Sequence, residues 1–166
     1  NLFDLNMSKL FEPSTVAGVT LKNRGCVSPM SQYKALDGFA NEWHAAHLGR
    51  FALGGCDLVF YEATAVSPEA RRTHGDLGLW DDAHVPALQK INAFITEQGA
   101  RTGVQLAHAG RKASERRPWH GETPVDEEDI RLRGESPWQA LSPTTEPYGG
   151  RWPSPKKMSA TDIQKV

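Results

Sequence analysis

The sequence predicts an α/β fold with a parallel sheet, preceded by a short β-hairpin. Residues 58–65 and 102–107 are rich in apolar and β-branched side chains without a helical period, which is typical of strands buried in a parallel sheet. Two other segments, residues 41–53 and 85–95, instead show helical spacing. Because strands and helices alternate, we expect parallel strands joined by right-handed crossovers.

The first element expected along the chain is the hairpin. Residues 1–6 precede Met7, which opens a stretch typical of a natural protein start, so we interpret residues 1–6 as an extension or a cloning junction. Residues 11–23 alternate apolar and polar side chains around Ala17-Gly18, which predicts a short β-hairpin. Residues 25–28 then form the first candidate strand of the parallel sheet.

Capping signals mark the two helices that follow. Asn41 is a suitable N-cap for the first helix, and Gly54-Gly55 is a suitable stop. A loop is expected at residues 67–84, after the second strand. Val85 begins the second helix and Gly99 ends it, just before the third strand.

A long segment, residues 111–157, is rich in Pro, Gly and Trp and shows no clear periodicity. A connection of this length is usually functional or linker-like. Its first part, residues 111–133, holds six basic and six acidic residues, which favours a solvated surface loop over a nucleic-acid patch. Ser159 to Asp162 resembles a capping box, so a helix should begin there, about one turn before Val166.

Composition narrows the class of protein. The chain has 166 residues with 19 basic and 20 acidic side chains and a formal net charge of -1, so no nucleic-acid partner is expected. No apolar run is long enough to span a membrane, and the N-terminus lacks the order of a signal peptide. Cys26 and Cys56 form no disulfide framework; we expect reduced, buried thiols in a cytoplasmic protein.

Polar residues follow or end each of the three predicted strands. Residues 28–33 follow the first strand, residues 62–65 end the second, and residues 105–112 end the third. Sites in parallel α/β folds form at the C-terminal ends of strands, so these residues should meet at one rim. Gln105 within a strand indicates a ligand or an internal network, because a buried amide must be hydrogen-bonded.

These segments resemble the Old Yellow Enzyme family, and within it the bacterial thermophilic-like subclass of ene-reductases. The resemblance runs from about Ser8 to Val166, in the order and spacing of the family. It rests on six segments together: Leu10-Phe11-Glu12-Pro13, Leu21-Lys22-Asn23-Arg24, Ser28-Pro29-Met30 with Tyr33, Glu62-Ala63-Thr64-Ala65-Val66, Asp76-Leu77-Gly78-Leu79-Trp80 and Gln105-Leu106-Ala107-His108-Ala109-Gly110-Arg111-Lys112.

The resemblance implies an FMN-binding (β/α)8 barrel. In such an enzyme NAD(P)H reduces the flavin, which then transfers hydride to the β-carbon of an activated alkene such as an enone. Residues 7–166 would be the N-terminal part of this single domain: the hairpin and the first three βα units. A complete barrel takes roughly 250 residues, so a complementary C-terminal half is expected to close it.

The resemblance also assigns cofactor contacts. Ser28, Pro29 and Met30 would contact the flavin through backbone and apolar groups. Ala63 would lie at the polar end of the isoalloxazine. Gln105 would hydrogen-bond the pyrimidine edge, because an amide offers both a donor and an acceptor.

Within the same site, the resemblance assigns Tyr33 to the substrate and Ser31 to the cofactor. Tyr33 would project into the pocket and hydrogen-bond the carbonyl of an activated alkene. Ser31 stands where this subclass usually has a redox-tuning cysteine, so an altered flavin potential of either sign is expected. His108 and Arg111 would help to build the rim. Simpler interpretations stay open: Ser28 could merely end a strand, and Tyr33 could be an ordinary loop aromatic.

Histidines and tryptophans outside these segments allow further interpretations. His44 and His47 share a face of the first helix. A metal pair is conceivable, but no third ligand follows, so packing or hydrogen bonding is favoured and no metal is expected. Three tryptophans of the long segment could cap the site, contact another subunit or be buried locally: Trp119, Trp138 and Trp152.

The expected function is an FMN-dependent ene-reductase to which this chain contributes part of the site. Alone, the chain would have two unpaired apolar sheet edges and is expected to be inactive. The family further implies a homo-oligomer of the assembled enzyme. One alternative is a non-catalytic half-barrel that serves as a structural or binding module. Another is a metal-dependent hydrolase or an aldolase, which would need His/Asp clusters or a Schiff-base Lys at the strand ends.

Overall fold

The N-terminal hairpin stands apart from the main sheet. The computed structural model describes residues 8–166, so residues 1–6 lie outside the described part. A short 3-10 turn, Lys9–Phe11, leads into β1 (Ser14–Val16) and β2 (Val19–Leu21), which pair antiparallel. The two linking residues, Ala17 and Gly18, have φ of 49° and 80°, which suits the turn that two-residue hairpins favour. The predicted hairpin is confirmed.

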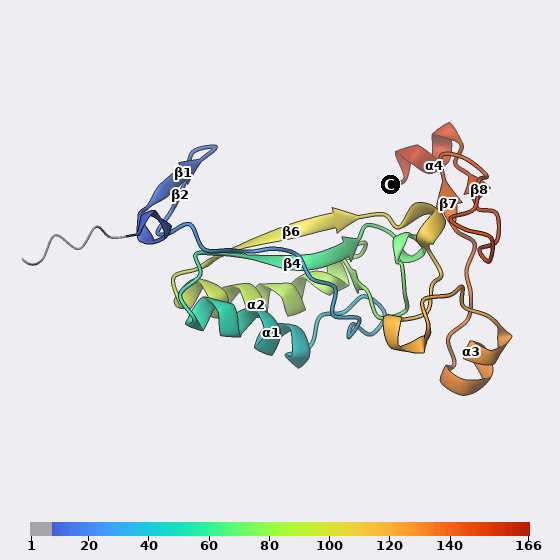
Figure 1. The fold of residues 1–166 in the computed structure, drawn as a ribbon, viewed down its shortest axis with the longest axis horizontal. Coiled ribbons are helices and arrows are strands. Elements are labelled where there is room, and N and C mark those ends of the chain that lie inside the picture. Colours follow the sequence, from blue (N-terminus) through green and yellow to red (C-terminus); the bar gives the residue numbers. More distant parts are fainter. Residues whose placement is uncertain (1–7) are drawn as a thin grey trace, which may run out of the picture.

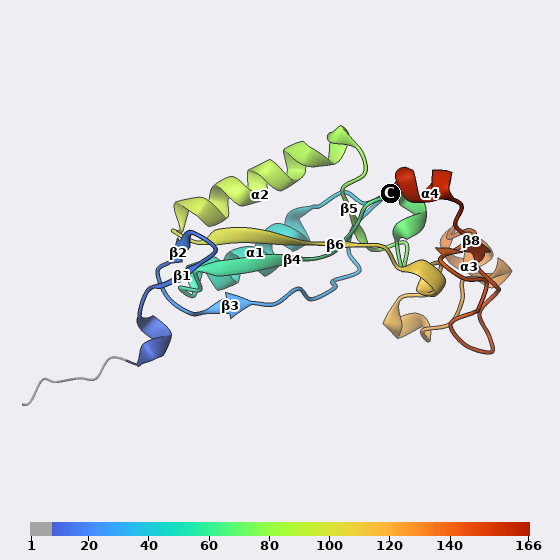
Figure 2. The same cartoon turned by 90° about the horizontal axis from the view of Figure 1, so that it is seen from above.

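Four parallel strands form the main sheet, with β4 at its centre (Figure 2). β6 pairs with β4 along its length, whereas β3 pairs with the beginning of β4 and β5 with its end. β3 and β5 therefore share the other edge of β4. The strands are β3 (Cys26–Val27), β4 (Leu58–Ala65), β5 (Leu77–Gly78) and β6 (Arg101–Ala107). β5 lies in the segment predicted as a loop, because two paired residues leave no detectable period.

Two helices cover one face of this sheet (Figure 1). α1 (Glu42–Leu53) begins at Asn41, whose side-chain oxygen accepts the backbone N–H of Trp43 at 3.1 Å, so the predicted N-cap is confirmed. α2 (Val85–Glu97) ends just before Gly99, as expected. The buried core lies between these helices and β4, and it includes Leu48, Val59, Tyr61, Leu77, Ile91 and Ile95.

The opposite face of the sheet carries no helix (Figure 1). On this open face the ring of Phe60 lies against Gly103 of the neighbouring strand, where an added Cβ would come within 2.4 Å of the ring. Cys26 is exposed, so its predicted burial is wrong; it lies on the short edge strand β3, in register with Leu58. Cys56 is half-buried against the core, closer to the expectation.

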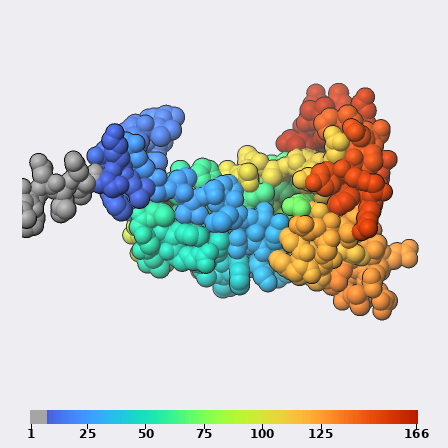
Figure 3. All heavy atoms as spheres, in the orientation of Figure 1, coloured from blue at the N-terminus to red at the C-terminus, as the bar shows by residue number. Residues whose placement is uncertain are grey.

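The chain after β6 gathers at the end of the molecule where β4 and β6 finish, in orange and red in Figure 3. We call residues 110–157 the excursion. It contains 3-10 turns at Gly110–Lys112 and Pro118–His120, the helix α3 (Glu127–Arg133), and two short parallel strands, β7 (Leu141–Ser142) and β8 (Lys156–Lys157). α4 (Ala160–Gln164) follows the capping box that begins at Ser159, as predicted.

Part of the excursion is more buried than expected. Asp129 is 0% exposed and binds Arg133 and, at 2.7 Å, Arg116. Glu115 is also buried and binds Arg72 from the loop after β4. The prediction of a solvated loop is therefore wrong for these residues. Their buried carboxylates form ion pairs with arginines in the same segment or next to it. None of the helices between residues 8 and 166 has the length and apolar character needed to cross a membrane.

Candidate functional site

The cofactor-binding residues expected from the sequence gather around the C-terminal end of β4. Ala63 of β4 is in register with Gln105 of β6, so these two lie side by side. On the other side of β4 runs the segment that continues β3, since the backbone N–H of Gln32 donates to Glu62 at 2.8 Å. Ser28, Met30, Ser31 and Gln105 are exposed, and Pro29 and Ala63 are half-buried.

This arrangement suits a planar, largely uncharged ring with one polar edge. Ala63 has only a methyl side chain and Gly103 has none, so a flat ring could approach the open face of the sheet closely beside the Phe60 ring. Gln105 is exposed, so the donor and acceptor of its amide are accessible to a ligand. A flavin has this shape and edge chemistry, and the residues present fit it. Among residues 8–166 no cluster of three or more His, Cys, Asp or Glu could hold a metal ion.

A β-bulge in β4 directs Glu62 away from the regular strand pattern. The register between β4 and β6 shifts between Tyr61 and Ala63, which leaves Glu62 as the additional residue. Bulges redirect side chains and occur often beside functional sites. The Glu62 side chain is 3% exposed, and its Oε2 accepts the N–H of Gln32.

His44 lies against the other oxygen of that carboxylate. His44 Nε2 is 3.1 Å from Glu62 Oε1, and the side chains are 2% and 3% exposed. His44 Nδ1 accepts the backbone N–H of Asn41 at 3.1 Å in the tautomer that carries its proton on Nε2. The histidine thus completes the N-cap of α1 while it faces Glu62. This confirms hydrogen bonding for His44, and it holds for His47 too, whose Nδ1 is hydrogen-bonded to Arg50 Nη2 at 3.2 Å while its ring packs edge-on against Phe51.

Tyr33 has a left-handed backbone, with φ of 56°, which is uncommon for a residue with a side chain. Its carbonyl oxygen accepts a hydrogen bond from Arg117 Nε at 3.3 Å. The same oxygen packs against Gly75, where an added Cβ would lie 2.4 Å from it. Its ring meets Trp119 edge-on, with ring centroids 5.7 Å apart. A small pocket of about 230 Å³ lies here, between Tyr33–Leu36 and the two excursion residues.

Burial raises the pKa of the Tyr33 phenol, although the nearby Arg72 guanidinium acts in the opposite direction. The phenol therefore keeps its proton at neutral pH and can donate a hydrogen bond to a carbonyl oxygen. Asp76, which organises the adjacent loop, accepts the Thr73 hydroxyl and the backbone N–H of Arg72, both at 2.7 Å. Burial raises the pKa of Asp76 despite these two hydrogen bonds.

The excursion reaches the site mainly through Arg117 and Trp119. Arg117 also binds Glu135, which ties the excursion to the backbone of Tyr33. Trp119 is 57% exposed beside Tyr33, in keeping with a capping position. Trp138 instead donates to the carbonyl of Glu69 at 3.1 Å and is half-buried, and Trp152 packs on Tyr148.

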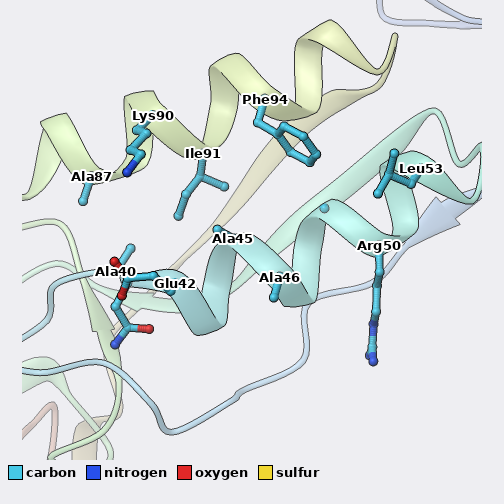
Figure 4. Close-up of a pocket in the computed structure, with 12 residues that line it drawn as sticks. Ala40, Glu42, Ala45, Ala46, Arg50, Leu53, Ala87, Lys90, Ile91 and Phe94 are labelled. Atoms are coloured by element: carbon cyan, nitrogen blue, oxygen red, sulfur yellow. The ribbon is translucent and has the colours of Figure 1, made fainter.

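A large groove lies elsewhere, between α1 and α2 on the outer side of the molecule (Figure 4). Its volume is about 630 Å³, and it is lined mainly by small and apolar side chains, including Ala45, Gly49, Ile91 and Phe94. It lies on the helix-covered side of the sheet, whereas Gln105 and Ala63 lie at the strand ends. The chemistry expected from the sequence therefore does not involve this groove.

Sequence reasoning missed the residues that hold the site together. Glu62 was part of a motif but had no assigned role, and Gly75 and Arg117 were not singled out. Glu62 could have been found, because a carboxylate inside the apolar run of residues 58–65 must be paired if it is buried. Nothing local in the sequence pairs Gly75 or Arg117 with Tyr33.

A parallel sheet with helices on one face and polar strand ends defines the beginning of a (β/α)8 barrel, and solved structures agree. Morphinone reductase matches with a TM-score of 0.72 and 22% identity over 95% of this chain and 42% of its own. An Old Yellow Enzyme from Pichia sp. AKU4542 matches with a TM-score of 0.74 and 20% identity over 95% of this chain and 39% of its own. These likenesses show the fold, and they confirm the predicted partial barrel.

Sequence comparison gives the family. The chain belongs to the NADH:flavin oxidoreductase / NADH oxidase family, which residues 9–166 match. An NADPH dehydrogenase of Geobacillus thermodenitrificans is 37% identical over 159 residues, covering 95% of this chain and 41% of that relative. An NADH:flavin oxidoreductase of Gibberella zeae is 38% identical over 160 residues, covering 96% of this chain and 38% of that relative. The chain thus spans about two fifths of these relatives, and the family implies an FMN cofactor with an NAD(P)H reductant.

Proposed function

We propose that this chain supplies part of the flavin and substrate site of an FMN-dependent ene-reductase, which a complementary C-terminal half of the barrel completes. The register pair of Ala63 and Gln105, at strand ends flanked by residues 28–31, carries this proposal. FMN bound there would take hydride from NAD(P)H and pass it to the β-carbon of an activated alkene such as an enone. The assembled enzyme is proposed to act in the cytoplasm as a homo-oligomer.

Each assigned residue has a defined part in this proposal. Ser28, Pro29 and Met30 would line the flavin, and the Ser31 hydroxyl would donate to it in place of a thiol. The Gln105 amide would bind its pyrimidine edge with one donor and one acceptor. Ala63 has no bulk beyond its Cβ, so the ring could approach β4 closely.

Tyr33 would bind the substrate. Its phenol stays protonated because burial raises its pKa, so it can donate to the carbonyl oxygen of an enone. Such a hydrogen bond strengthens as negative charge develops on that oxygen during hydride transfer, which stabilises the transition state. Arg117 and Gly75 would keep the residue in position through its backbone.

The proposal is tested by assembling the barrel from this chain and a C-terminal half, then recording its visible spectrum and its alkene-dependent NAD(P)H oxidation. We expect a yellow complex that contains both polypeptides and reduces cyclohexenone. A complex that forms without flavin would contradict the proposal and favour the non-catalytic alternative. So would flavin binding and full activity by this chain alone, verified by intact mass, because the complementary half would then be unnecessary.

Gln105→Leu tests the flavin contact directly. In the assembled protein it removes the only side-chain amide beside Ala63 on β6, so we expect FMN to bind about tenfold or more weakly, as for a lost hydrogen bond of about 1.5 kcal/mol. Flavin titration measures this affinity. Gln139→Leu, at an exposed amide that donates within the excursion to the carbonyl of Ser154, is the matched control and should leave flavin affinity unchanged.

A further inference from the structure

We propose that Glu62 is a positioning residue: its buried carboxylate, held by His44, fixes the segment 28–35 against the end of β4 through the backbone N–H of Gln32. The inference rests on the proposed function, because that segment carries the residues assigned to the flavin and the substrate. It goes beyond that function by assigning a role to two residues that would touch neither.

The contact joins three elements at one point. Glu62 lies at the bulge of β4, His44 lies in the first turn of α1, and Gln32 lies in the connection between β3 and α1. Oε1 of Glu62 faces His44 Nε2 at 3.1 Å, while Oε2 accepts the N–H of Gln32 at 2.8 Å. One carboxylate therefore uses one oxygen for the helix and the other for the connection.

Individual hydrogen bonds, instead of strand pairing, hold the connection near this point. Residues 28–35 form no regular secondary structure, so their backbone lacks the ladder of hydrogen bonds that a strand would have. The side chain of Gln32 donates to the carbonyl of Met30 at 2.7 Å and accepts from Trp43 Nε1 at 3.1 Å. Asn41 donates to the carbonyl of Lys34 at 2.7 Å. The first turn of α1 thus holds this segment through Asn41 and Trp43 directly, and through His44 by way of Glu62.

The buried pair of His44 and Glu62 contributes more to the position of the connection than to the stability of the protein. Taking a carboxylate and an imidazole out of water costs several kcal/mol, and a buried pair usually returns little more than that. Neither His44 Nε2 nor Glu62 Oε1 has another polar partner within the described chain. What the pair provides is a fixed acceptor for Gln32, directly between Ser31 and the left-handed Tyr33.

The consequence for catalysis is a defined position for Ser31 and Tyr33. A misplacement of about 1 Å in a reacting site can cost about a hundredfold in rate. Loss of the Gln32 contact should therefore reduce alkene reduction without removing any group that touches flavin or substrate.

Glu62→Ala in the assembled flavoprotein tests this inference. We expect hydrogen exchange of the Gln32 amide to become at least about tenfold faster, because its acceptor is gone. We also expect kcat/KM for cyclohexenone, normalised to bound FMN, to fall about tenfold to a hundredfold. Glu97→Ala is the matched control: this carboxylate is exposed at the end of α2, and both quantities should stay unchanged.

Two conservative variants separate positioning from general destabilisation. Glu62→Gln keeps one acceptor oxygen, but its amide NH2 group then faces either the Gln32 N–H or the Nε2–H of His44, and both are donors. Exchange and activity should therefore fall between those of the parent protein and those of Glu62→Ala. Glu62→Asp keeps the charge but is one methylene shorter, so it should withdraw from Gln32 and speed its exchange even where Glu62→Ala fails to fold.

Several outcomes would overturn the inference. One is an unchanged exchange rate at Gln32 in both Glu62→Ala and Glu62→Asp. Another is a loss of FMN with unchanged activity per bound flavin, which would mark a merely structural role. A third is an unchanged kcat/KM per bound flavin in Glu62→Ala although the Gln32 amide exchanges faster. If the parent protein bound no flavin, the proposed function would fail, while the exchange of Gln32 would still decide whether Glu62 holds the segment.

Discussion

At the scale of single residues, Tyr33 shows how neighbours hold a costly conformation. A left-handed backbone at a residue with a side chain costs roughly 1–3 kcal/mol and persists only where the surroundings impose it. Here the carbonyl of Tyr33 is bound by Arg117 and packed against Gly75, and its ring contacts Trp119. These contacts come from two separate parts of the chain, the loop at Gly75 and residues 117–119, which indicates that the position of Tyr33 matters to the site.

Gly75→Ala should disturb Tyr33 without changing its side chain. The new Cβ would lie 2.4 Å from the Tyr33 carbonyl oxygen, and a backbone atom cannot move away as a flexible side chain can. We expect the assembled protein to lose about 1–3 kcal/mol of stability, as in other overpacked sites, and the KM for cyclohexenone to rise. Thermal unfolding and steady-state kinetics measure both effects.

Gly150→Ala is the control for this substitution. An added Cβ there meets no atom within 4 Å, so stability should change by less than about 0.5 kcal/mol. An equal loss in both variants would show that the approach of Tyr33 to Gly75 is not the cause.

Tyr33→Phe tests the phenol as a hydrogen-bond donor. Burial raises its pKa above the ordinary value of 10.0, so the phenol is neutral below that value and any contribution of the neutral form is lost only as pH rises beyond it. We expect the ratio of parent to variant activity to exceed unity and to stay constant from about pH 6 to about pH 9. A ratio that falls within this range would contradict a donor role, and loss of FMN would mark Tyr33 as structural.

The sequence alone predicted which residues would meet, but not what holds them. The strand-end positions of Ala63 and Gln105 follow from period and register, and the structure pairs them. The burial of Cys26 was predicted wrongly, because a sequence does not show which strand lies at an edge. The contact between Gly75 and Tyr33 could not be predicted from the sequence either, since it depends on how two loops approach one another.

At the scale of elements, length decided what could be predicted. The two long helices were found because their apolar period extends over enough residues. The strands predicted at residues 58–65 and 102–107 were found because their runs of apolar and β-branched side chains are long enough. The seven-residue α3 was missed, although its ends carry usable signals: Asp126 caps it, Asp129 completes a capping box, and Gly134 ends it with φ of 69°. A helix of this length has too few turns to show an apolar face.

Asp129→Ala should loosen the excursion. The carboxylate is 0% exposed, binds Arg116 and Arg133, and accepts the backbone N–H of Asp126 at 2.9 Å. Its loss leaves two arginines without their buried partner, so we expect a local destabilisation of about 3–5 kcal/mol. Limited proteolysis should then cut within residues 114–136 much faster than in the parent protein.

Arg131→Ala is the control on the same helix. Arg131 and Glu128 are both exposed, with Nη2 of the arginine 3.6 Å from Oε1 of the glutamate. Such exposed ion pairs contribute less than about 1 kcal/mol to the free energy of unfolding. Proteolysis of this variant should match the parent protein. If the cleavage rate of Asp129→Ala also matched the parent, the buried ion pairs would not be what orders the excursion.

At the scale of the whole molecule, the sheet is open at β6, and this edge carries exposed apolar side chains. β6 pairs with β4 on one side only among the described residues, and two of its apolar side chains remain exposed: Val104 at 41% and Leu106 at 61%. Leu106 is in register with buried Thr64, so it belongs to the face that helices cover, but α2 does not reach it. In a closed barrel the next strand and helix would cover both side chains.

Leu106→Lys should therefore weaken assembly with the C-terminal half. Burying a leucine side chain is worth about 1.5–3 kcal/mol, and a lysine ammonium would have to stay in water, so the dissociation constant of the two halves should rise by about tenfold to a hundredfold. Titration of one half with the other, followed by flavin fluorescence, measures this constant. Leu132→Lys is the control, because Leu132 is 56% exposed on α3, away from the strand edge, and its replacement should leave assembly unchanged. Equal affinities for both variants would mean that the half does not dock along β6.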